Sequence, residues 1–139
     1  MVLETQPPAK YTWKIENFSS LEGKRCFSPT FTAGDHNWRI EALPDGKYLS
    51  LKLDYADHDK LGRDMKVVYV ELKLRVIDQI NQENKEIGYT GVVNCGFRSM
   101  GWSNFVPLED LNKQTGFLVN DVCVVEAEFV VQGTPMRWN

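Results

Sequence analysis

The sequence predicts an all-β fold, a sandwich of short antiparallel strands. Apolar and polar residues alternate with a period of two in several segments, and turn residues recur between those segments. Only two short stretches have the pattern of a helical turn. Because successive side chains of a strand point to opposite faces, this alternation buries one face of each strand and leaves the other in water. Several such strands in series are typical of a β-sandwich.

The N-terminal half contains three alternating segments. Their apolar faces are Tyr11, Trp13 and Ile15, then Trp38, Ile40 and Ala42, then Leu49, Leu51 and Leu53. Residues 17–21 could form one helical turn, and the Pro-Asp-Gly sequence at 44–46 predicts a turn between the second and third strands. Proline has no backbone N–H, so Pro29 predicts an edge strand or a bulge. The aromatic residues predicted to lie in the core are Trp13, Phe18, Phe31 and Trp38.

The C-terminal half contains two longer alternating segments, at residues 66–78 and 121–131. A polar hairpin loop is predicted at 79–86, and Pro107 would begin a second helical turn at 107–111. The glycines spread through β segments are Gly88, Gly91, Gly96 and Gly101. Within a strand, glycine marks a bulge or a close approach of two backbones.

Size and composition indicate one globular domain and limit its partners. The chain has 139 residues, of which 42% are hydrophobic and 25% charged, as in an average globular domain. A net charge of -3 and a pI near 5.4 disfavour nucleic acid, which requires a basic face. No run of about 18 apolar residues is present, so we expect no membrane span. The N-terminus does not have the pattern of a signal peptide, so the expected location is the cytoplasm, with the nucleus as an alternative.

The sequence shows no residue pattern typical of catalysis or of a metal or cofactor site. The two histidines, His36 and His58, have no cysteine in a glycine-rich nucleophile turn to act with, and no Gly-x-Ser-x-Gly segment is present. Residues 57–68 match the first positions of a calcium loop, but Val68 stands where the closing carboxylate is required. Zinc would need four closely spaced Cys or His ligands. We therefore expect a binding protein rather than an enzyme, with no cofactor.

Several dispersed segments occur in a characteristic order. They are Trp13-x-Ile15-x-Asn17-Phe18-Ser19, Phe27-x-x-x-Phe31-x-x-Gly34-x-x-x-Trp38-x-Ile40, Pro44, Tyr48-Leu49-Ser50-Leu51-x-Leu53, and the segments 101–108 and 116–128. Together they resemble the meprin and TRAF homology (MATH) domain, and the last segment is most similar to plant members. The resemblance covers residues 10–132, with a flexible lead-in at 1–9 and a tail at 133–139.

The resemblance implies an eight-stranded antiparallel sandwich that binds short extended peptides in a shallow groove on one sheet. Members of the family recruit partners or substrates, commonly for the ubiquitin system or receptor signalling. The resemblance therefore implies an adaptor module whose partners are short linear motifs of other proteins. Matched position by position, the groove residues are Glu41, Lys52, Leu72, Cys95, Phe97, Arg98, Met100, Gly101 and Trp102.

At several of these positions the chain departs from the family. Met100-Gly101-Trp102 stands at a turn where many members have Trp-Gly-Phe, and Lys52 stands where several members carry an aromatic residue. Cys95 also replaces a larger side chain. Peptide binding as a class is implied, but no known peptide motif transfers. Leu72 shares the parity of the apolar face of its strand, which predicts burial.

Two other functions remain alternatives. One is the non-catalytic substrate-recognition domain of a deubiquitinating cysteine protease, whose catalytic residues would lie outside these 139 residues. The other is a carbohydrate-binding sandwich that uses Trp102 and tyrosines as stacking platforms. The alternation disfavours this second alternative, because it places most rings inside. No heptad run is present, so the isolated domain is predicted to be a monomer.

Overall fold

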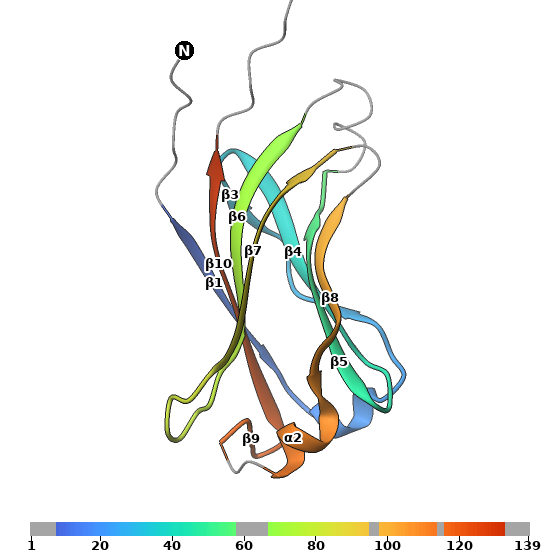
Figure 1. The fold of residues 1–139 in the computed structure, drawn as a ribbon. Helices are drawn as coiled ribbons and strands as arrows, with labels where there is room; N and C mark the ends of the chain where they lie inside the picture. The colour runs from blue at the N-terminus through green and yellow to red at the C-terminus, as the bar shows by residue number, and fades with distance from the viewer. Residues whose placement is uncertain (1–7, 58–66, 95–97, 114–115, 133–139) are drawn as a thin grey trace, which may run out of the picture.

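The computed structural model describes residues 8–57, 67–94, 98–113 and 116–132, which form a two-layered antiparallel β-sandwich (Figure 1). The expected lead-in at 1–9 overlaps this part only at Pro8 and Ala9, and Ala9 already belongs to the first strand. The expected tail at 133–139 and two of the expected groove residues, Cys95 and Phe97, lie outside the described residues.

Each layer of the sandwich is one sheet. Sheet A has the strand order β1 (Ala9–Ile15), β10 (Val122–Gln132), β6 (Val68–Val76) and β7 (Lys85–Val93), with β9 (Leu118–Val119) paired to β10. Sheet B has the order β2 (Cys26–Phe27), β4 (His36–Pro44), β5 (Tyr48–Tyr55) and β8 (Ser99–Pro107), with β3 (Phe31–Ala33) paired to β4. Strands β2 and β3 flank Pro29 at one edge, which confirms the predicted interruption. If β2 and β3 are counted as one strand and the two-residue β9 is left out, the described part has the expected eight strands.

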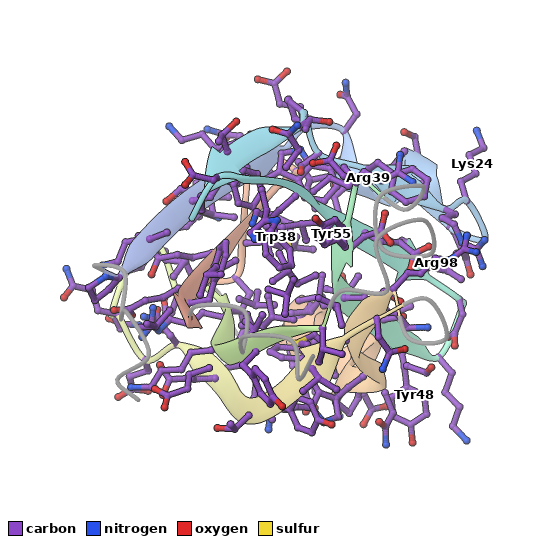
Figure 2. All side chains as sticks on the ribbon, turned by 90° about the horizontal axis from the view of Figure 1, so that it is seen from above. Lys24, Trp38, Arg39, Tyr48, Tyr55 and Arg98 are labelled. Atoms are coloured by element: carbon purple, nitrogen blue, oxygen red, sulfur yellow. The ribbon has the colours of Figure 1, made fainter. Side chains whose placement is uncertain are left out.

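The core lies between the two sheets. Trp38 and Tyr55 are almost fully buried there, with their ring centroids 5.1 Å apart in an edge-on arrangement (Figure 2). Phe18 is also buried, as predicted. Trp13 and Phe31 pack against the core but are only partly buried, which corrects the prediction. They lie on β1 and β3, at sheet edges where no further described strand covers them.

Two helical turns, η1 (Phe18–Leu21) and α2 (Leu108–Lys113), close one end of the sandwich (Figure 1). The Phe18 N–H donates to the Asp121 carbonyl oxygen at 2.9 Å. The Asp121 carboxylate accepts hydrogen bonds from the Ser19 N–H at 3.0 Å and the Ser19 hydroxyl at 2.7 Å. The Asn-Phe-Ser segment of the sequence is therefore a structural joint between η1 and the start of β10.

Other boundaries differ from the prediction by a few residues. The strand predicted at 66–78 is observed at Val68–Val76, and β7 begins at Lys85, inside the predicted loop 79–86. Helix α2 begins at Leu108, because Pro107 is the last residue of β8. Such shifts are common, since strand ends depend on the neighbouring strand as well as on local pattern.

The turn between β4 and β5 determines the register of sheet B. The Asp45 carboxylate accepts hydrogen bonds from the Tyr48 N–H at 2.6 Å and the Lys47 N–H at 2.8 Å, and these bonds lower the pKa of the Asp45 carboxyl. With this turn in place, Glu41 of β4 lies opposite Lys52 of β5. The predicted turn is confirmed, and it brings two of the expected groove residues side by side.

Strand β8 pairs regularly with β5 only in its first half. Residues 99–102 pair with residues 51–54 without interruption, whereas residues 103–105 all lie opposite Ser50, which forms a bulge. Met100-Gly101-Trp102 is therefore part of a strand, and the expected turn at this place is wrong. A Cβ on Gly101 would lie 2.1 Å from the Leu51 carbonyl oxygen, so the glycine marks a close backbone approach.

Candidate functional site

Three of the expected groove residues form one row across sheet B. Glu41 of β4 pairs with Lys52 of β5, and Lys52 pairs with Gly101 of β8. Cross-strand partners share a face of the sheet. Leu51 and Leu53, on either side of Lys52, are fully buried, so this row lies on the outer face of sheet B.

The other expected groove residues are distributed differently. Leu72 belongs to sheet A, and its side chain is only 2% exposed, as its parity predicted. Met100 is 6% exposed and belongs to the core. Arg98 is exposed and directly precedes β8, where its carbonyl oxygen accepts a hydrogen bond from the Tyr55 N–H at 2.8 Å. Trp102 is partly buried and packs against the core.

A groove of about 520 Å³ runs around the edge of β8. Its lining residues are Lys52, Tyr89, Gly91, Val92, Ser99, Met100, Gly101, Trp102 and Ser103. Ser99, Gly101 and Lys52 come from the outer face of sheet B, whereas Met100 and Trp102 come from its inner face. The groove thus contacts both faces of one strand edge, and β7 of sheet A forms its far wall.

An aromatic pair spans this side of the sandwich. The rings of Tyr89 on β7 and Trp102 on β8 meet nearly perpendicularly, with centroids 6.1 Å apart. Behind them, Trp102 contacts the buried Phe105 at 6.0 Å. The Tyr89 ring folds back over Gly91, where an added Cβ would lie 2.3 Å from a ring carbon. Tyr89 remains 50% exposed, so the groove has an aromatic wall that water can reach.

Sequence reasoning missed the β7 wall. Gly91 was assigned only to a β segment, and Tyr89 and Val92 were not singled out, because which strands face each other across the sandwich is a non-local property. One local signal was present: residues 87–93 contain neither charge nor proline. Edge strands usually carry charged residues or proline to prevent unwanted pairing, so a segment without either indicates an edge that can accept another strand.

Charge on the outer face of sheet B is distributed unevenly. The Arg25 guanidinium contacts the Glu41 carboxylate at 2.9 Å, and that of Arg39 contacts the Asp54 carboxylate at 2.6 Å. Arg39 also lies over the Phe27 ring, 3.8 Å from its centroid. Among the residues that the structure describes, no carboxylate pairs with the Lys52 ammonium. The groove therefore has one cationic wall.

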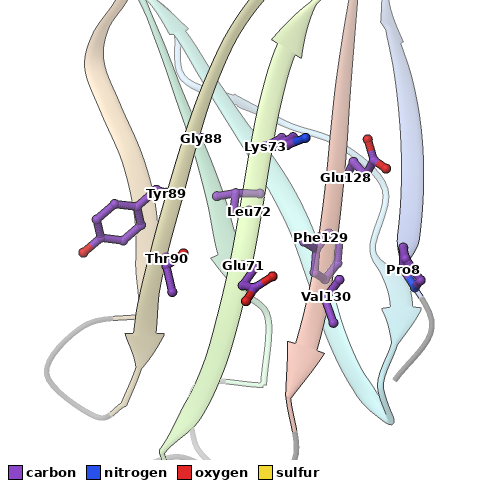
Figure 3. A pocket seen from close by; sticks show the side chains of 10 residues that line it. All are labelled: Pro8, Glu71, Leu72, Lys73, Gly88, Tyr89, Thr90, Glu128, Phe129 and Val130. Carbon is purple, nitrogen blue, oxygen red and sulfur yellow. The ribbon is translucent and has the colours of Figure 1, made fainter. Parts of the chain in front are cut away.

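A second hollow lies over sheet A (Figure 3). Around Gly88 it is lined by side chains of β6, β7 and β10, among them Lys73, Glu128 and Thr90, while Tyr89 points away from β6. The Glu128 carboxylate is held by Arg75 at 2.6 Å, and that bond lowers the pKa of Glu128. Strands β6 and β10 are both paired on two sides, so their backbone groups offer nothing to a ligand here. The β8 groove is therefore the better candidate.

Other kinds of site find little support in the part of the chain described. No group of three or more His, Cys, Asp or Glu side chains there is arranged to hold a metal ion. No helix among these residues is long and apolar enough to cross a membrane. Of the exposed aromatic side chains described, Phe27 lies on the outer face of sheet B, Tyr69 on that of sheet A, and Tyr89 between the sheets, so they form no common stacking platform.

Comparisons with known proteins agree with the fold. The MATH domain family model matches residues 10–129. The chain is 33% identical to ubiquitin C-terminal hydrolase 13 of Arabidopsis thaliana, over 98% of the chain and 13% of that protein. It is 36% identical to a MATH domain and coiled-coil domain-containing protein of the same plant, over 86% of the chain and 38% of that protein. The solved structure of TRAF5 from Notothenia coriiceps has the same fold, with a TM-score of 0.63 at 18% identity, over 94% of this chain and 74% of that one.

These matches confirm both the fold and the predicted similarity to plant members of the family. The chain spans 13% and 38% of the lengths of the two curated relatives, so the similarity concerns one domain of each. The family model, by contrast, matches most of the present chain. The protein therefore belongs to the MATH domain family.

Proposed function

We propose that this domain binds a short extended peptide segment of another protein as an added strand along β8. The observation that carries the proposal is a groove that surrounds a strand edge with no partner strand among the described residues, instead of lying on a paired face. An edge strand has unpaired N–H and C=O groups that an extended peptide can satisfy, and side-chain pockets beside it then provide specificity. MATH and TRAF domains are protein-interaction modules, which agrees with this role.

The absence of protective residues on this side supports the proposal. The uncharged, proline-free segments of β7 (87–93) and β8 (99–106) both border the groove. On the opposite side, β1 carries Lys10 and Lys14, while β2 and β3 are short and interrupted at Pro29. Lysine, proline and short length are the usual means by which proteins prevent strand addition. The two segments that border the groove contain neither lysine nor proline, although β7 begins with Lys85 and β8 ends with Pro107.

Selection of binding peptides from a random library, followed by hydrogen exchange, tests the proposal. A bound peptide should slow amide exchange at alternate residues of 99–102, because an added strand covers the N–H groups that point away from β5. Trp102→Ala should weaken binding by about 2 kcal/mol, the loss typical of an aromatic anchor. Affinity is expected in the micromolar range, because a short peptide buries less than the ~1,600 Å² of a standard interface.

Tyr11→Ala is the matched control for Trp102→Ala. It also removes a partly buried aromatic ring at an edge, on the side away from the groove. Urea unfolding of both variants separates loss of binding from loss of fold. Protection confined to β1, or equal weakening of binding by the two substitutions, would show that the β8 edge is not the site.

A link to ubiquitin-dependent recruitment is the broader part of the proposal. The similarity to a ubiquitin C-terminal hydrolase covers nearly the whole chain but a small part of that enzyme. In such a parent protein the domain would select substrates, and the catalysis would reside elsewhere. An electrophilic ubiquitin probe should therefore leave the 139-residue chain unlabelled. Labelling of a cysteine in this chain would contradict the non-catalytic role.

A further inference from the structure

The groove offers two different environments to neighbouring residues of an added strand. Gly101 and Lys52 share the outer face of sheet B, whereas Trp102 lies on the inner face with Leu51. In an added strand, the side chain opposite Gly101 projects to the outer face and the next one to the inner face. Two consecutive peptide residues therefore meet unlike surroundings.

The outer environment is open and cationic. Gly101 has no side chain, and an added Cβ would lie only 2.1 Å from the Leu51 carbonyl oxygen. This leaves a notch at the β8 edge, and Lys52 lies directly behind it in the next strand. Glu41, the cross-strand partner of Lys52, forms an ion pair with Arg25. The Lys52 ammonium can therefore pair with a carboxylate of a ligand.

The inner environment is aromatic. Trp102 and Tyr89 form its walls. None of the described residues that line the groove is Asp or Glu. An acidic ligand residue therefore meets no repulsion from the lining, whereas a basic residue would have to approach Lys52 without a counter-charge.

We propose that the groove selects segments in which an acidic residue stands directly beside an apolar one. The carboxylate lies over Gly101 and binds the Lys52 ammonium, while the apolar side chain packs against Trp102. A charge-assisted hydrogen bond of this kind is stronger than one between neutral groups. The inference rests on the proposed strand addition along β8 and adds to it the chemistry of the ligand.

The test uses four pools of end-capped peptides about ten residues long, enough to cover β8 at ~3.4 Å per residue. Each pool has a fixed central pair, which is Glu-Leu, Gln-Leu, Lys-Leu or Glu-Ser, among uncharged flanking residues. Both orders of the pair are included, because an added strand can run in either direction. Fluorescence anisotropy measures binding of each pool to the intact chain. End-capping removes the terminal charges.

Glu-Leu should bind most tightly, and Gln-Leu about three- to tenfold more weakly, as expected for a partly solvated ion pair. Raising the salt concentration from about 0.1 M to about 1 M should reduce this difference, since the Debye length falls from about 10 Å to about 3 Å. Lys-Leu should bind more weakly than Gln-Leu, and Glu-Ser more weakly than Glu-Leu.

Variants of Lys52 give the decisive comparison. Lys52→Met should bind Glu-Leu and Gln-Leu equally, and Lys52→Glu should prefer Lys-Leu. Lys14→Met is the matched control, because it removes the same charge from the outer face of sheet A and should leave the preference unchanged. Circular dichroism checks that each variant is folded, and Lys52→Met alone decides if Lys52→Glu does not fold.

The outcomes separate this inference from the proposed function. If wild type shows no preference for Glu-Leu, or Lys52→Met retains it, charge selection by Lys52 is refuted. Should Trp102→Ala weaken binding in that case and exchange at residues 99–102 be slowed, strand addition at β8 stands without charge selection. If no pool binds and exchange at residues 99–102 is unaffected by every pool, both ideas fail.

Discussion

Aromatic pairs of very different kinds lie at the two long sides of the sandwich. On one side, the rings of Tyr11 from β1 and Phe31 from β3 stack in parallel, with centroids 4.1 Å apart. The ring of the buried Phe129 packs against Phe31, with centroids 6.0 Å apart. On the other side, Tyr89 and Trp102 meet edge-on at 6.1 Å and leave a groove of about 520 Å³. The first pair closes the gap between the sheets, whereas the second leaves it open.

The difference shows how one fold can combine a protected edge with an accessible one. Both pairs connect sheet A to sheet B, so both contribute to the packing of the layers. On the side with the loose pair, the strand segments 87–93 and 99–106 also contain no lysine or proline. The stability of the domain and its binding should therefore respond to different substitutions.

The largest effect is expected from Gly101→Val, which would break the open side. Its Cβ would collide with the Leu51 carbonyl and the Lys52 Cα, at 2.1 and 2.6 Å. Separating β5 from β8 should cost about 3 kcal/mol of unfolding free energy, at the upper end for overpacking, and should abolish peptide binding. Gly88→Ala on β7 is the control, since its Cβ would make ordinary contacts at 3.6 Å or more. Equal urea midpoints for the two variants would contradict the close approach at Gly101.

A smaller effect should distinguish the two aromatic pairs directly. Tyr11→Ala removes a stacked ring on the closed side and should lower the unfolding free energy by about 2 kcal/mol, without changing the affinity for a selected peptide. Tyr89→Ala removes a half-exposed ring and should cost less than about 1 kcal/mol, while weakening peptide binding severalfold. Urea unfolding and anisotropy titration of both variants provide the measurement. The comparison is wrong if the two substitutions have the same pair of effects.

The smallest effect concerns pH and lies outside the groove. The hydrogen bond from Arg75 lowers the pKa of Glu128 below its ordinary value of 4.5. A lowered pKa in the folded state means that this carboxylate stabilises the fold above its unfolded pKa, and that the contribution is lost as pH falls through the folded pKa. The urea midpoint should therefore decrease on acidification below about pH 4.5, the ordinary pKa of a glutamate. Glu128→Gln should make that decrease less steep, and an unchanged pH profile would contradict the role of this pair.

Local pattern was sufficient to predict most of the fold. The alternation around Leu51 and Val70 depends only on which residues face the core, so the strands there appear nearly where they were predicted. The strand interruption at Pro29 and the turn at Asp45 were also predictable, because each residue acts through its local backbone chemistry. The burial of Trp13 and Phe31 was overestimated, because alternation does not distinguish an edge strand from a central one.

The candidate site was less predictable because it depends on which strands become neighbours. The family resemblance named Lys52, Gly101 and Trp102 as groove residues, and all three line the β8 groove, although the resemblance placed Gly101 and Trp102 at a turn. The opposite wall, with Tyr89, comes from the other sheet and has no local signature beyond the missing charges. Leu72 was expected both in the groove and in the core, and the structure places its side chain in the core.

The bulge at residues 103–105 limits what any partner can gain from β8. Uninterrupted pairing with β5 extends over only four residues before the bulge and resumes at Val106 and Pro107, so the regular edge that borders the groove is equally short. A ligand held by so few backbone bonds dissociates rapidly, and its residence time increases little with its length. Strong association would then come from multivalency: two domains joined in one assembly, and two segments on one partner, raise the effective concentration and can increase avidity by about 10²–10⁴ without any new contact.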